Sequence, residues 1–186
     1  MENEMKGPYE VISTRNAYRN PWISVREDKV IRPGGKEGYF GVIEMKAGSS
    51  VLALTQHNEV YLVKEYKYGI ERDSTEVMSG ALEAEETSLD AAKRELKEEL
   101  GLEAIEWVDL GMVDPFTTVV RSPNYMFLAM GVKEGENSPD EGEVLEVIRV
   151  PFLEAVEMVM RSEITHSASC VLILKADKYL RQDRRA

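Results

Sequence analysis

Residues 80–102 read GALEAEETSLDAAKRELKEELGL, and this stretch decides the fold. It predicts a helix over Ser88–Leu100, because apolar residues recur there at helical spacing. These residues are Leu89, Ala92, Leu96 and Leu100. Thr87 or Ser88 can cap the first turn with a hydroxyl, and Gly101 suits the position after the last turn, where a left-handed conformation is common. One face of the predicted helix is therefore suited to packing against a core.

Three glutamates lie together beside this apolar stripe. Glu95, Glu98 and Glu99 are spaced i, i+3 and i+4, so they are neighbours on the helix surface. Like charges at this spacing repel by roughly a few tenths of a kcal/mol per pair, and Arg94 and Lys97 offset only part of that cost. A divalent cation that prefers oxygen ligands, Mg²⁺ or Mn²⁺, would offset more. The alternative is a solvent-exposed charged face, which acidic-basic runs commonly form.

A longer pattern surrounds the glutamates and favours the metal interpretation. Five residues separate Gly80 from Glu86, and seven more precede the triplet 94–96. One residue then leads to the pair 98–99, and one more to the pair 101–102. The stretch resembles the Nudix box, GX5EX7REUXEEXGU with U aliphatic, and matches it at every defined position. Average residue usage makes such a match by chance very improbable.

The resemblance covers the chain from near Gly48 to its C-terminus and implies an α/β fold. Residues 49–186 are expected to form a Nudix domain, an α/β/α sandwich around a mixed sheet, with the box as a loop-helix-loop. The chain's own pattern agrees with this class of fold. Short apolar runs predict strands at residues 51–54, 60–63, 107–113, 125–132 and 144–150. Two further helices are expected, one beginning at Pro151 and one over Ser167–Leu180.

Residues 1–48 precede the expected Nudix domain and are predicted to form a β-strand segment. Strands are indicated within residues 22–31 and 39–43, with the turn Arg32–Gly35 between them. The first 20 residues are polar and mixed, and contribute little core. In ADP-ribose pyrophosphatases of the Nudix family, such a segment exchanges strands between the subunits of a homodimer and lines the nucleobase pocket. The resemblance therefore implies a homodimer, with Trp22 as a candidate for stacking on the base.

Nudix hydrolases split a nucleoside diphosphate linked to another moiety at its pyrophosphate, with a water that divalent cations activate. The resemblance implies four ligands for Mg²⁺ or Mn²⁺, namely Glu95, Glu98, Glu99 and the backbone carbonyl of Ser79. Arg94 is expected to hold the box glutamates in register, and Glu86 to support the loop. A diphosphate is repelled by bare glutamates, so a cation between them is needed to polarise phosphorus and activate the water.

A second pattern upstream of the box resembles the ADP-ribose pyrophosphatase branch, V-x-Q-Y-R-Y followed by E-[LV]-P-A-G. Here it reads VKEYKY over residues 63–68 and EVMSG over residues 76–80. Lys67 stands for the arginine and keeps its positive charge without the bidentate fork. The resemblance implies that Lys67, Glu76 and Gly80 contact substrate, together with Trp22. In that branch a mobile acidic loop also supplies a glutamate that acts on the nucleophilic water. Its candidates here are Glu143, then Glu141, with Glu146 as a third.

Composition limits the other classes of function. The net charge is −11, from 23 Lys and Arg against 34 Asp and Glu, which argues against a nucleic-acid or anionic-membrane surface. Cys170 is the only cysteine, and we expect a cytoplasmic protein because a reducing compartment fits best. The expected activity is hydrolysis of ADP-ribose to AMP and ribose 5-phosphate, or of a nucleotide sugar. The alternatives are a hydrolase that removes non-standard nucleotides and a Nudix module that binds a nucleotide sugar without hydrolysing it.

Overall fold

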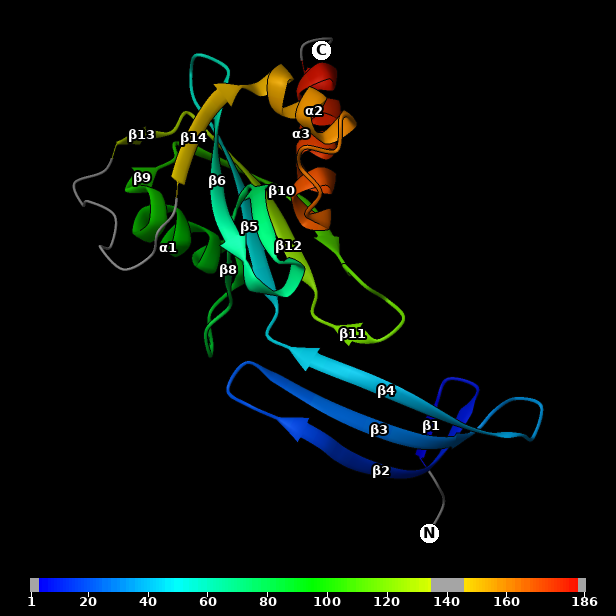
Figure 1. Cartoon of the computed structure of the whole chain (residues 1–186). Helices are drawn as coiled ribbons and strands as arrows, with labels where there is room; N and C mark the ends of the chain where they lie inside the picture. The colour runs from blue at the N-terminus through cyan, green and yellow to red at the C-terminus, as the bar shows by residue number, and fades with distance from the viewer. Residues whose placement is uncertain (1–3, 135–145, 184–186) are drawn as a thin grey trace. The chain divides into compact units, whose positions relative to one another are not determined.

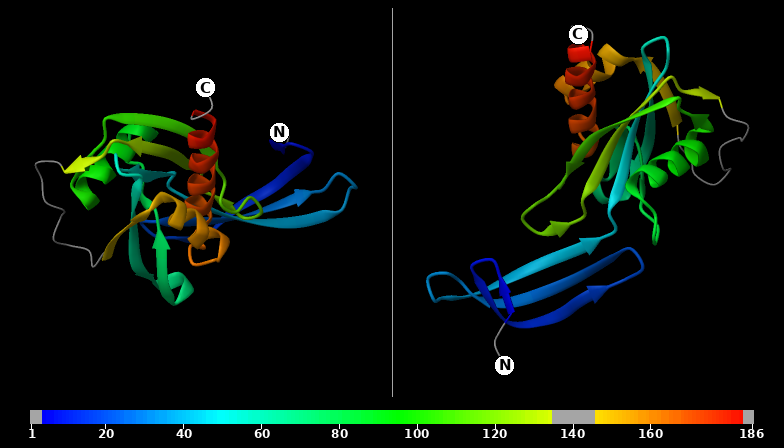
Figure 2. Two further views of the ribbon diagram at one scale, coloured as in Figure 1. Left: turned by 90° about the horizontal axis from the view of Figure 1, so that it is seen from above. Right: turned by 180° about the vertical axis from the view of Figure 1, so that it is seen from behind.

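The computed structural model describes residues 4–134 and 146–183, and the chain forms two compact units. The first unit contains residues 1–46 and 114–123, and the second contains residues 47–113 and 124–186 (Figures 1 and 2). Residues 114–123, which follow a strand of the second unit, therefore belong to the first. Each unit is described by itself below.

The first unit is a five-stranded sheet with the order β1-β2-β3-β4-β11. Its strands are β1 (Glu4–Lys6), β2 (Tyr9–Arg19), β3 (Ile23–Ile31), β4 (Glu37–Met45) and β11 (Val120–Arg121). The strands predicted within residues 22–31 and 39–43 are β3 and β4, and the turn between them is also present. The eleven-residue strand β2 was not predicted, because Val11 is the one residue in it that is buried and most of the strand is exposed. A strand exposed on both faces carries no apolar alternation to reveal it.

A buried carboxylate holds the first three strands together. Asp28 of β3 is 4% exposed and accepts hydrogen bonds from Lys6 Nζ at 3.0 Å, Thr14 Oγ1 at 2.7 Å and Arg26 Nε at 3.2 Å. Burial raises the pKa of Asp28, but the bonds from Thr14, Lys6 and Arg26 outweigh it and hold the pKa below its ordinary value. Since a buried charge is costly without partners, this cluster favours one register of β1, β2 and β3.

The second unit contains a seven-stranded mixed sheet whose main order is β10-β12-β5-β6-β14. Its strands are β5 (Gly48–Leu54), β6 (Glu59–Lys67), β7 (Arg72–Glu76), β8 (Met78–Ala81), β10 (Glu106–Val113), β12 (Asn124–Met130) and β14 (Glu146–Pro151). The pair β12–β5 is parallel and the other pairs are antiparallel. A separate two-stranded sheet joins β9 (Leu102–Glu103) to β13 (Lys133–Glu134), and the 3-10 turn η1 (Tyr68–Ile70) links β6 to β7.

Helices cover both faces of this sheet, as Figure 1 shows: α1 (Ser88–Leu100) on one side, and α2 (Phe152–Met160) and α3 (Ser167–Asp183) on the other. The alternation of side chains along a strand explains the two layers. Leu52 packs in the core with α2 and α3, whereas Val51, its neighbour in β5, packs in the core with α1. The expected α/β/α sandwich with a mixed sheet is confirmed. None of the helices within the described ranges is both long and apolar enough to cross a membrane.

Local signals fix the ends of α1 as predicted. Thr87 is the N-cap, and its Oγ1 accepts a hydrogen bond from the Asp90 N–H at 3.1 Å. Gly101 ends the helix with φ 63°, a conformation that glycine adopts without strain. The second predicted helix begins one residue later than expected, because Pro151 is its N-cap and Phe152 its first helical residue.

The sheet splits where β5 and β6 separate. These strands pair over residues 53–54 and 60–61, and further along β6 pairs with β7 while β5 pairs with β8. Both new pairs are antiparallel. The chain passes from β7 to β8 through the single residue Val77, which belongs to neither strand and forms neither a turn nor a bend. It therefore crosses from β6 to β5 at the split, so the end of β7 and the start of β8 lie there together.

Candidate active site

A cavity of about 360 Å³ opens where β6, β7, β8 and α1 meet. It is lined by Val63, Glu65, Lys67, Glu76, Ser79, Gly80, Glu95 and Glu99. Four of these side chains are carboxylates and one is an ammonium group. The lining is therefore strongly polar, with an excess of negative charge.

Strand geometry explains why these residues converge. Val63, Glu65 and Lys67 alternate along β6, so their side chains lie on one face of the sheet. Glu76 of β7 pairs with Val63, and Ser79 of β8 pairs with Ser50 of β5. The split in the sheet thus presents three strands to the acidic face of α1.

Gly80 permits the closest contact between the sheet and α1. A Cβ atom at this position would lie 2.0 Å from both Cδ and Oε1 of Glu95, far inside van der Waals contact. The carboxylate of Glu95 therefore rests directly on the backbone of β8. The box requires glycine here because no side chain fits between β8 and Glu95.

Arg94 connects the loop of the box to its helix. Its Nε and Nη2 atoms donate to the two carboxylate oxygens of Glu86 at 2.9 and 3.0 Å. Its Nη1 atom donates to Glu95 Oε1 at 2.8 Å and to Glu98 Oε2 at 3.0 Å, and Nη2 also reaches the Ala81 carbonyl at 3.2 Å. One guanidinium thus fixes three of the box carboxylates.

These hydrogen bonds shift the pKa values of Glu86 and Arg94 in the directions that favour their charged forms. The bonds from Arg94, with a weaker one from the Glu83 N–H, hold the pKa of Glu86 below its ordinary value. The same bonds raise the pKa of Arg94, so the guanidinium stays charged. The loop before α1 is consequently anchored by an ion pair that persists at neutral pH.

Among the residues that the structure describes, Lys67 is the one cation that lines the cavity. Burial lowers its pKa, but the ion pair with Glu65 and the nearby charges of Glu76 and Glu99 outweigh burial and raise the pKa. Lys67 is therefore protonated at neutral pH, and its ammonium group lies among carboxylates that repel a diphosphate.

The structure brings most of the residues singled out from the sequence to one place. The cavity is lined by six of them, namely Lys67, Glu76, Ser79, Gly80, Glu95 and Glu99. Glu86 and Arg94 form the adjacent network, and Glu98 is half-exposed and bound to Arg94 rather than lining the cavity.

Trp22 lies in the first unit and is 75% exposed. The loop candidates Glu141 and Glu143 lie outside the described residues, and Glu146 of β14 is exposed at 3.6 Å from Lys64 Nζ.

Two residues that contribute to the site were not predicted from the sequence. Glu65 lines the cavity. The strand was predicted to end at Val63, and its extension to Lys67, as in β6, would have placed Glu65 on the same face as Lys67. His166 lies 3.3 Å from Glu76 through its Nδ1 atom, a contact between segments 90 residues apart in the chain. Nothing local in the sequence indicates such a contact.

The donor set of the cavity suits a divalent cation. The carboxylates of the cavity are hard oxygen donors of the kind that Mg²⁺ and Mn²⁺ prefer, Ser79 also lines the cavity, and one lysine does not balance four glutamates. Within residues 4–134 and 146–183, no group of three or more His, Cys, Asp or Glu side chains already converges on one point. The residues therefore fit a cation by chemistry and charge, and their carboxylates would turn towards it on binding.

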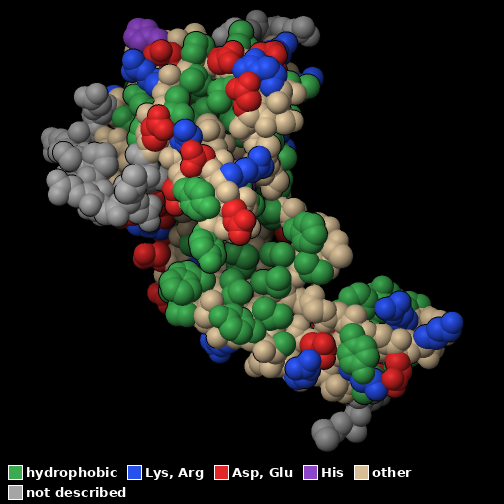
Figure 3. All heavy atoms as spheres, viewed as in Figure 1, with side chains coloured by type: hydrophobic (Ala, Val, Ile, Leu, Met, Phe, Trp, Pro, Cys, Tyr) green, Lys and Arg blue, Asp and Glu red, His purple; other side chains and the backbone are tan. Residues whose placement is uncertain are grey.

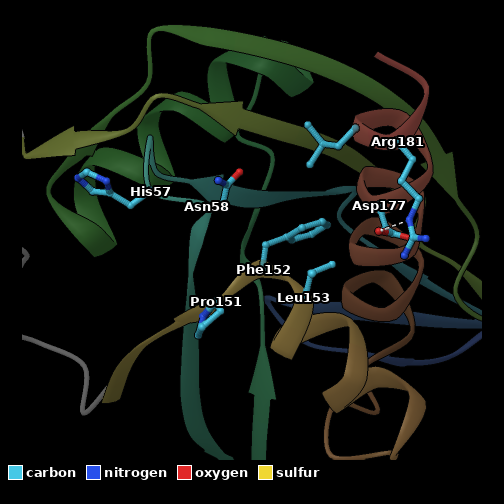
Figure 4. Close-up of a pocket in the computed structure, with 8 residues that line it drawn as sticks. His57, Asn58, Pro151, Phe152, Leu153, Asp177 and Arg181 are labelled. Carbon is cyan, nitrogen blue, oxygen red and sulfur yellow. Dashed lines mark hydrogen bonds and ion pairs between the residues drawn. The ribbon is translucent and has the colours of Figure 1, made fainter. Parts of the chain in front are cut away.

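A larger cavity, of about 530 Å³, lies elsewhere in the second unit, between the β5–β6 turn and the ends of α2 and α3 (Figure 4). Phe152, Leu153 and Leu180 supply apolar walls, and Asp177 is already paired with Arg181 at 2.8 Å. Among the described residues of this lining, Asp177 is the one carboxylate, so the group of carboxylates that could hold a cation against a diphosphate is missing there. The smaller cavity is therefore the candidate active site.

Comparison with known families agrees with the fold and the box. The NUDIX domain model matches residues 45–169, about two thirds of the chain, and the model of the nucleoside diphosphate sugar hydrolase N-terminal domain matches residues 9–43. The chain therefore belongs to the Nudix family. The family resemblance stated from the box is confirmed, and the expectation of a Nudix hydrolase agrees with it.

Individual relatives extend over most of the chain. An ADP-ribose pyrophosphatase from Mycobacterium tuberculosis is 27% identical over 89% of this chain and 82% of its own length, and one from Bacillus subtilis is 27% identical over 82% and 84%. A methanol dehydrogenase activator from Bacillus methanolicus is 25% identical over 87% and 89%. The crystal structure of an ADP compounds hydrolase superposes with a TM-score of 0.85, covering 99% of this chain and 100% of that one at 17% identity, which shows a shared fold.

Substitution of Gly80 tests the contact between β8 and α1. In Gly80→Ala the new Cβ displaces the Glu95 carboxylate, and we expect turnover of a nucleoside diphosphate substrate to fall about a hundredfold, the usual cost of misplacing a reacting group by an ångström. The matched control is Gly34→Ala, whose added Cβ meets nothing within 4 Å. Steady-state rates of both purified variants provide the measurement, and a Gly80→Ala rate equal to that of Gly34→Ala would contradict the assignment.

The lowered pKa of Glu86 predicts how stability depends on pH. A carboxylate with a depressed folded pKa stabilises the fold above its unfolded value, about 4.3, and this contribution is lost as the pH falls through the folded pKa. Glu86→Gln should therefore be less stable than the wild type at pH 7, with a difference that shrinks below about pH 4.

Urea denaturation at a series of pH values from 7 down to about 2.5 measures this difference. The control is Glu85→Gln, an exposed neighbour, for which the difference from the wild type should stay small and constant. A Glu86→Gln difference that does not change with pH would show that the ion pair with Arg94 does not stabilise the fold.

Proposed function

We propose that the chain hydrolyses the pyrophosphate bond of ADP-ribose, releasing AMP and ribose 5-phosphate, with Mg²⁺ or Mn²⁺ as cofactor. The observation that carries this proposal is the cavity in which box residues Glu95 and Glu99 face Lys67 and Glu76 of the strands. Two relatives that span most of the chain are ADP-ribose pyrophosphatases, which supports the choice of substrate. The completely retained box supports catalysis over a binding module.

In the proposed mechanism, the box residues hold the cation and position the diphosphate. Glu95, Glu98, Glu99 and the carbonyl of Ser79 are the proposed ligands. The cation, when bound, neutralises the diphosphate and lowers the pKa of the attacking water. Arg94 keeps one oxygen of Glu95 and one of Glu98 fixed through its Nη1 atom, and the other oxygen of each carboxylate is the proposed ligand atom.

The other residues bind the substrate and move a proton. Lys67 donates to a phosphate oxygen, and Glu76 accepts from a hydroxyl of the sugar moiety. A loop glutamate, Glu143 or else Glu141, takes the proton from water as its oxygen attacks phosphorus. The bridging P–O bond breaks, and the two phosphates leave as AMP and ribose 5-phosphate. These roles follow the charges that each group carries.

A nucleotide sugar is the second candidate substrate. Residues 9–43 match the N-terminal domain of nucleoside diphosphate sugar hydrolases, an observation that favours this class specifically. The same match makes a hydrolase for non-standard nucleotides a poorer candidate.

We retain the assignment of residues 1–48 as a segment that completes the base pocket, with Trp22 as its stacking residue, and of residues 49–186 as the hydrolase domain. A cytoplasmic location also forms part of the proposal, because Cys170 is the only cysteine.

We also propose that the chain forms a homodimer. The hairpin between β6 and β7 carries Tyr66, Tyr68 and Ile70, which are 57%, 90% and 51% exposed. Figure 3 shows hydrophobic side chains gathered on the face of the second unit that carries this hairpin. An exposed apolar patch of this kind is common at subunit interfaces, and a second copy of the chain would cover it.

Product analysis tests the proposed activity. Purified protein with Mg²⁺ or Mn²⁺ should convert ADP-ribose to AMP and ribose 5-phosphate faster than it hydrolyses ADP-glucose, UDP-glucose or 8-oxo-dGTP, and excess EDTA should abolish the reaction. Anion-exchange separation of the products measures this. Faster hydrolysis of a nucleotide sugar would replace ADP-ribose by the second candidate, and the absence of all turnover would favour a binding module.

The metal role of the box is tested with the same assay. Glu99→Gln removes one carboxylate charge from the cavity, and we expect kcat at saturating Mg²⁺ to fall at least about a hundredfold, as for other groups that stabilise transition-state charge. Glu157→Gln on the exposed face of α2 is the matched control and should keep the wild-type rate. A Glu99→Gln rate near that of the wild type would remove Glu99 from the ligand set.

Sedimentation velocity at micromolar concentration tests the dimer. We expect a particle of twice the 21.0 kDa chain mass for the wild type. Tyr68→Asp should shift it to the monomer, because a charge buried in an apolar interface is costly. Leu153→Asp, at a 63% exposed site on α2, is the control. A monomeric wild type would overturn the proposal, and a dimeric Tyr68→Asp would exclude the hairpin as the interface.

A further inference from the structure

The crossing from β7 to β8 at Val77 is held from the far face of the sheet by the start of α3. Val77 belongs to neither β7 nor β8, and its N–H donates to Ser169 Oγ at 3.0 Å. Ser169 is fully buried, so this bond replaces a ladder bond without help from solvent. The side chain of Ser169 thus satisfies the backbone at the point where the chain passes from β6 to β5 beside the cavity.

His166 extends this contact to the cavity itself. Its Nδ1 atom lies 2.8 Å from Ser169 Oγ and 3.3 Å from Glu76 Oε2. A carboxylate only accepts, so Nδ1 carries the hydrogen in its contact with Glu76. The Ser169 hydroxyl has two acceptor lone pairs, so it can accept from the Val77 N–H and share the Nδ1 hydrogen with Glu76. A third contact from the same segment, Arg72 Nη2 to Thr165 Oγ1 at 3.2 Å, reaches the beginning of β7.

The carboxylate of Glu76 needs such support. It is 11% exposed on a wall that also carries Glu65 and Glu99, which repel it, and Lys67, which attracts it. His166 holds Glu76 Oε2, whereas Glu65 forms the ion pair with Lys67. Without His166, the Glu76 carboxylate is free to turn towards the ammonium group and away from the position in which it would bind a substrate.

We propose that His166 is a positioning residue for substrate binding, which acts through Ser169 and Glu76 and keeps the Glu76 carboxylate available to a sugar hydroxyl. This inference rests on the proposed function, because it takes Glu76 as a substrate contact. His166 itself lines no part of the cavity. Its effect is therefore on affinity and not on the chemical step.

The experiment compares histidine variants in the full chain, with the substrate that the wild type hydrolyses fastest in the panel above. His166→Ala should raise KM about tenfold, the cost of one hydrogen bond to a charged group, and leave kcat within about twofold. His166→Asn places an amide near the position of Nδ1 and should restore KM to within about threefold of the wild type. His57→Ala, at the other histidine of the chain, is the matched control and should change neither constant.

Melting temperature separates positioning from a structural role. The support expected for the proposal is a raised KM in His166→Ala with a melting temperature close to that of the wild type. If His166→Ala does not fold, His166→Gln takes its place, since it keeps the bulk but moves the polar group one bond further. Ser169→Ala, which removes the link to Val77, should raise KM at least as much as His166→Ala does.

Three results would overturn the inference while leaving the proposed function intact. They are an unchanged KM in His166→Ala, a loss confined to kcat, and a failure of His166→Asn to restore KM. In each case the wild type still hydrolyses its substrate. A wild type that hydrolyses no member of the panel removes the proposed function first, and the inference falls with it.

Discussion

The guanidinium of Arg94 is the interaction on which the rest of the site depends. It binds Glu86 through two parallel hydrogen bonds and reaches Glu95 and Glu98 through Nη1. Charge-assisted bonds in this fork geometry are stronger than neutral ones and fix direction as well as distance. Without Arg94, the crowded carboxylates of α1 would repel one another and the preceding loop would lose its anchor. The acidic helix is therefore stable in this geometry because one cation serves three carboxylates.

The parts of the fold that the sequence predicts are those set by local chemistry. The limits of α1 follow from the hydroxyl of Thr87 and the left-handed Gly101, and the sandwich follows from alternation along β5 and β12. The site is predictable to the same extent, because the box spacing places Glu95 and Glu99 on one helical face. Glu76 and Lys67 were predicted as substrate contacts from the resemblance to ADP-ribose pyrophosphatases, and the structure brings them to the same cavity.

The unpredicted parts depend on contacts between distant segments. Strand β2 is mostly exposed, and Asp28 holds its partner β3 to it. A buried charge of this kind cannot be predicted from a pattern of apolar residues. The crossing at Val77 is the second case: β7 pairs with β6 and β8 with β5, and the Val77 N–H between them donates to Ser169, 92 residues away. Long-range hydrogen bonds of this kind leave no periodic trace in the sequence.

The cavity is supported by residues outside its lining, and this support has a physical reason. Arg94 restrains Glu95, and His166 lies against Glu76. The carboxylates between them face a volume in which like charges outnumber Lys67, so that each would turn away unless held from behind. Support from outside the cavity leaves its interior free for a cation and a diphosphate. The residues around the cavity thus hold its carboxylates close together, although these repel one another, until the proposed substrate and cation bind.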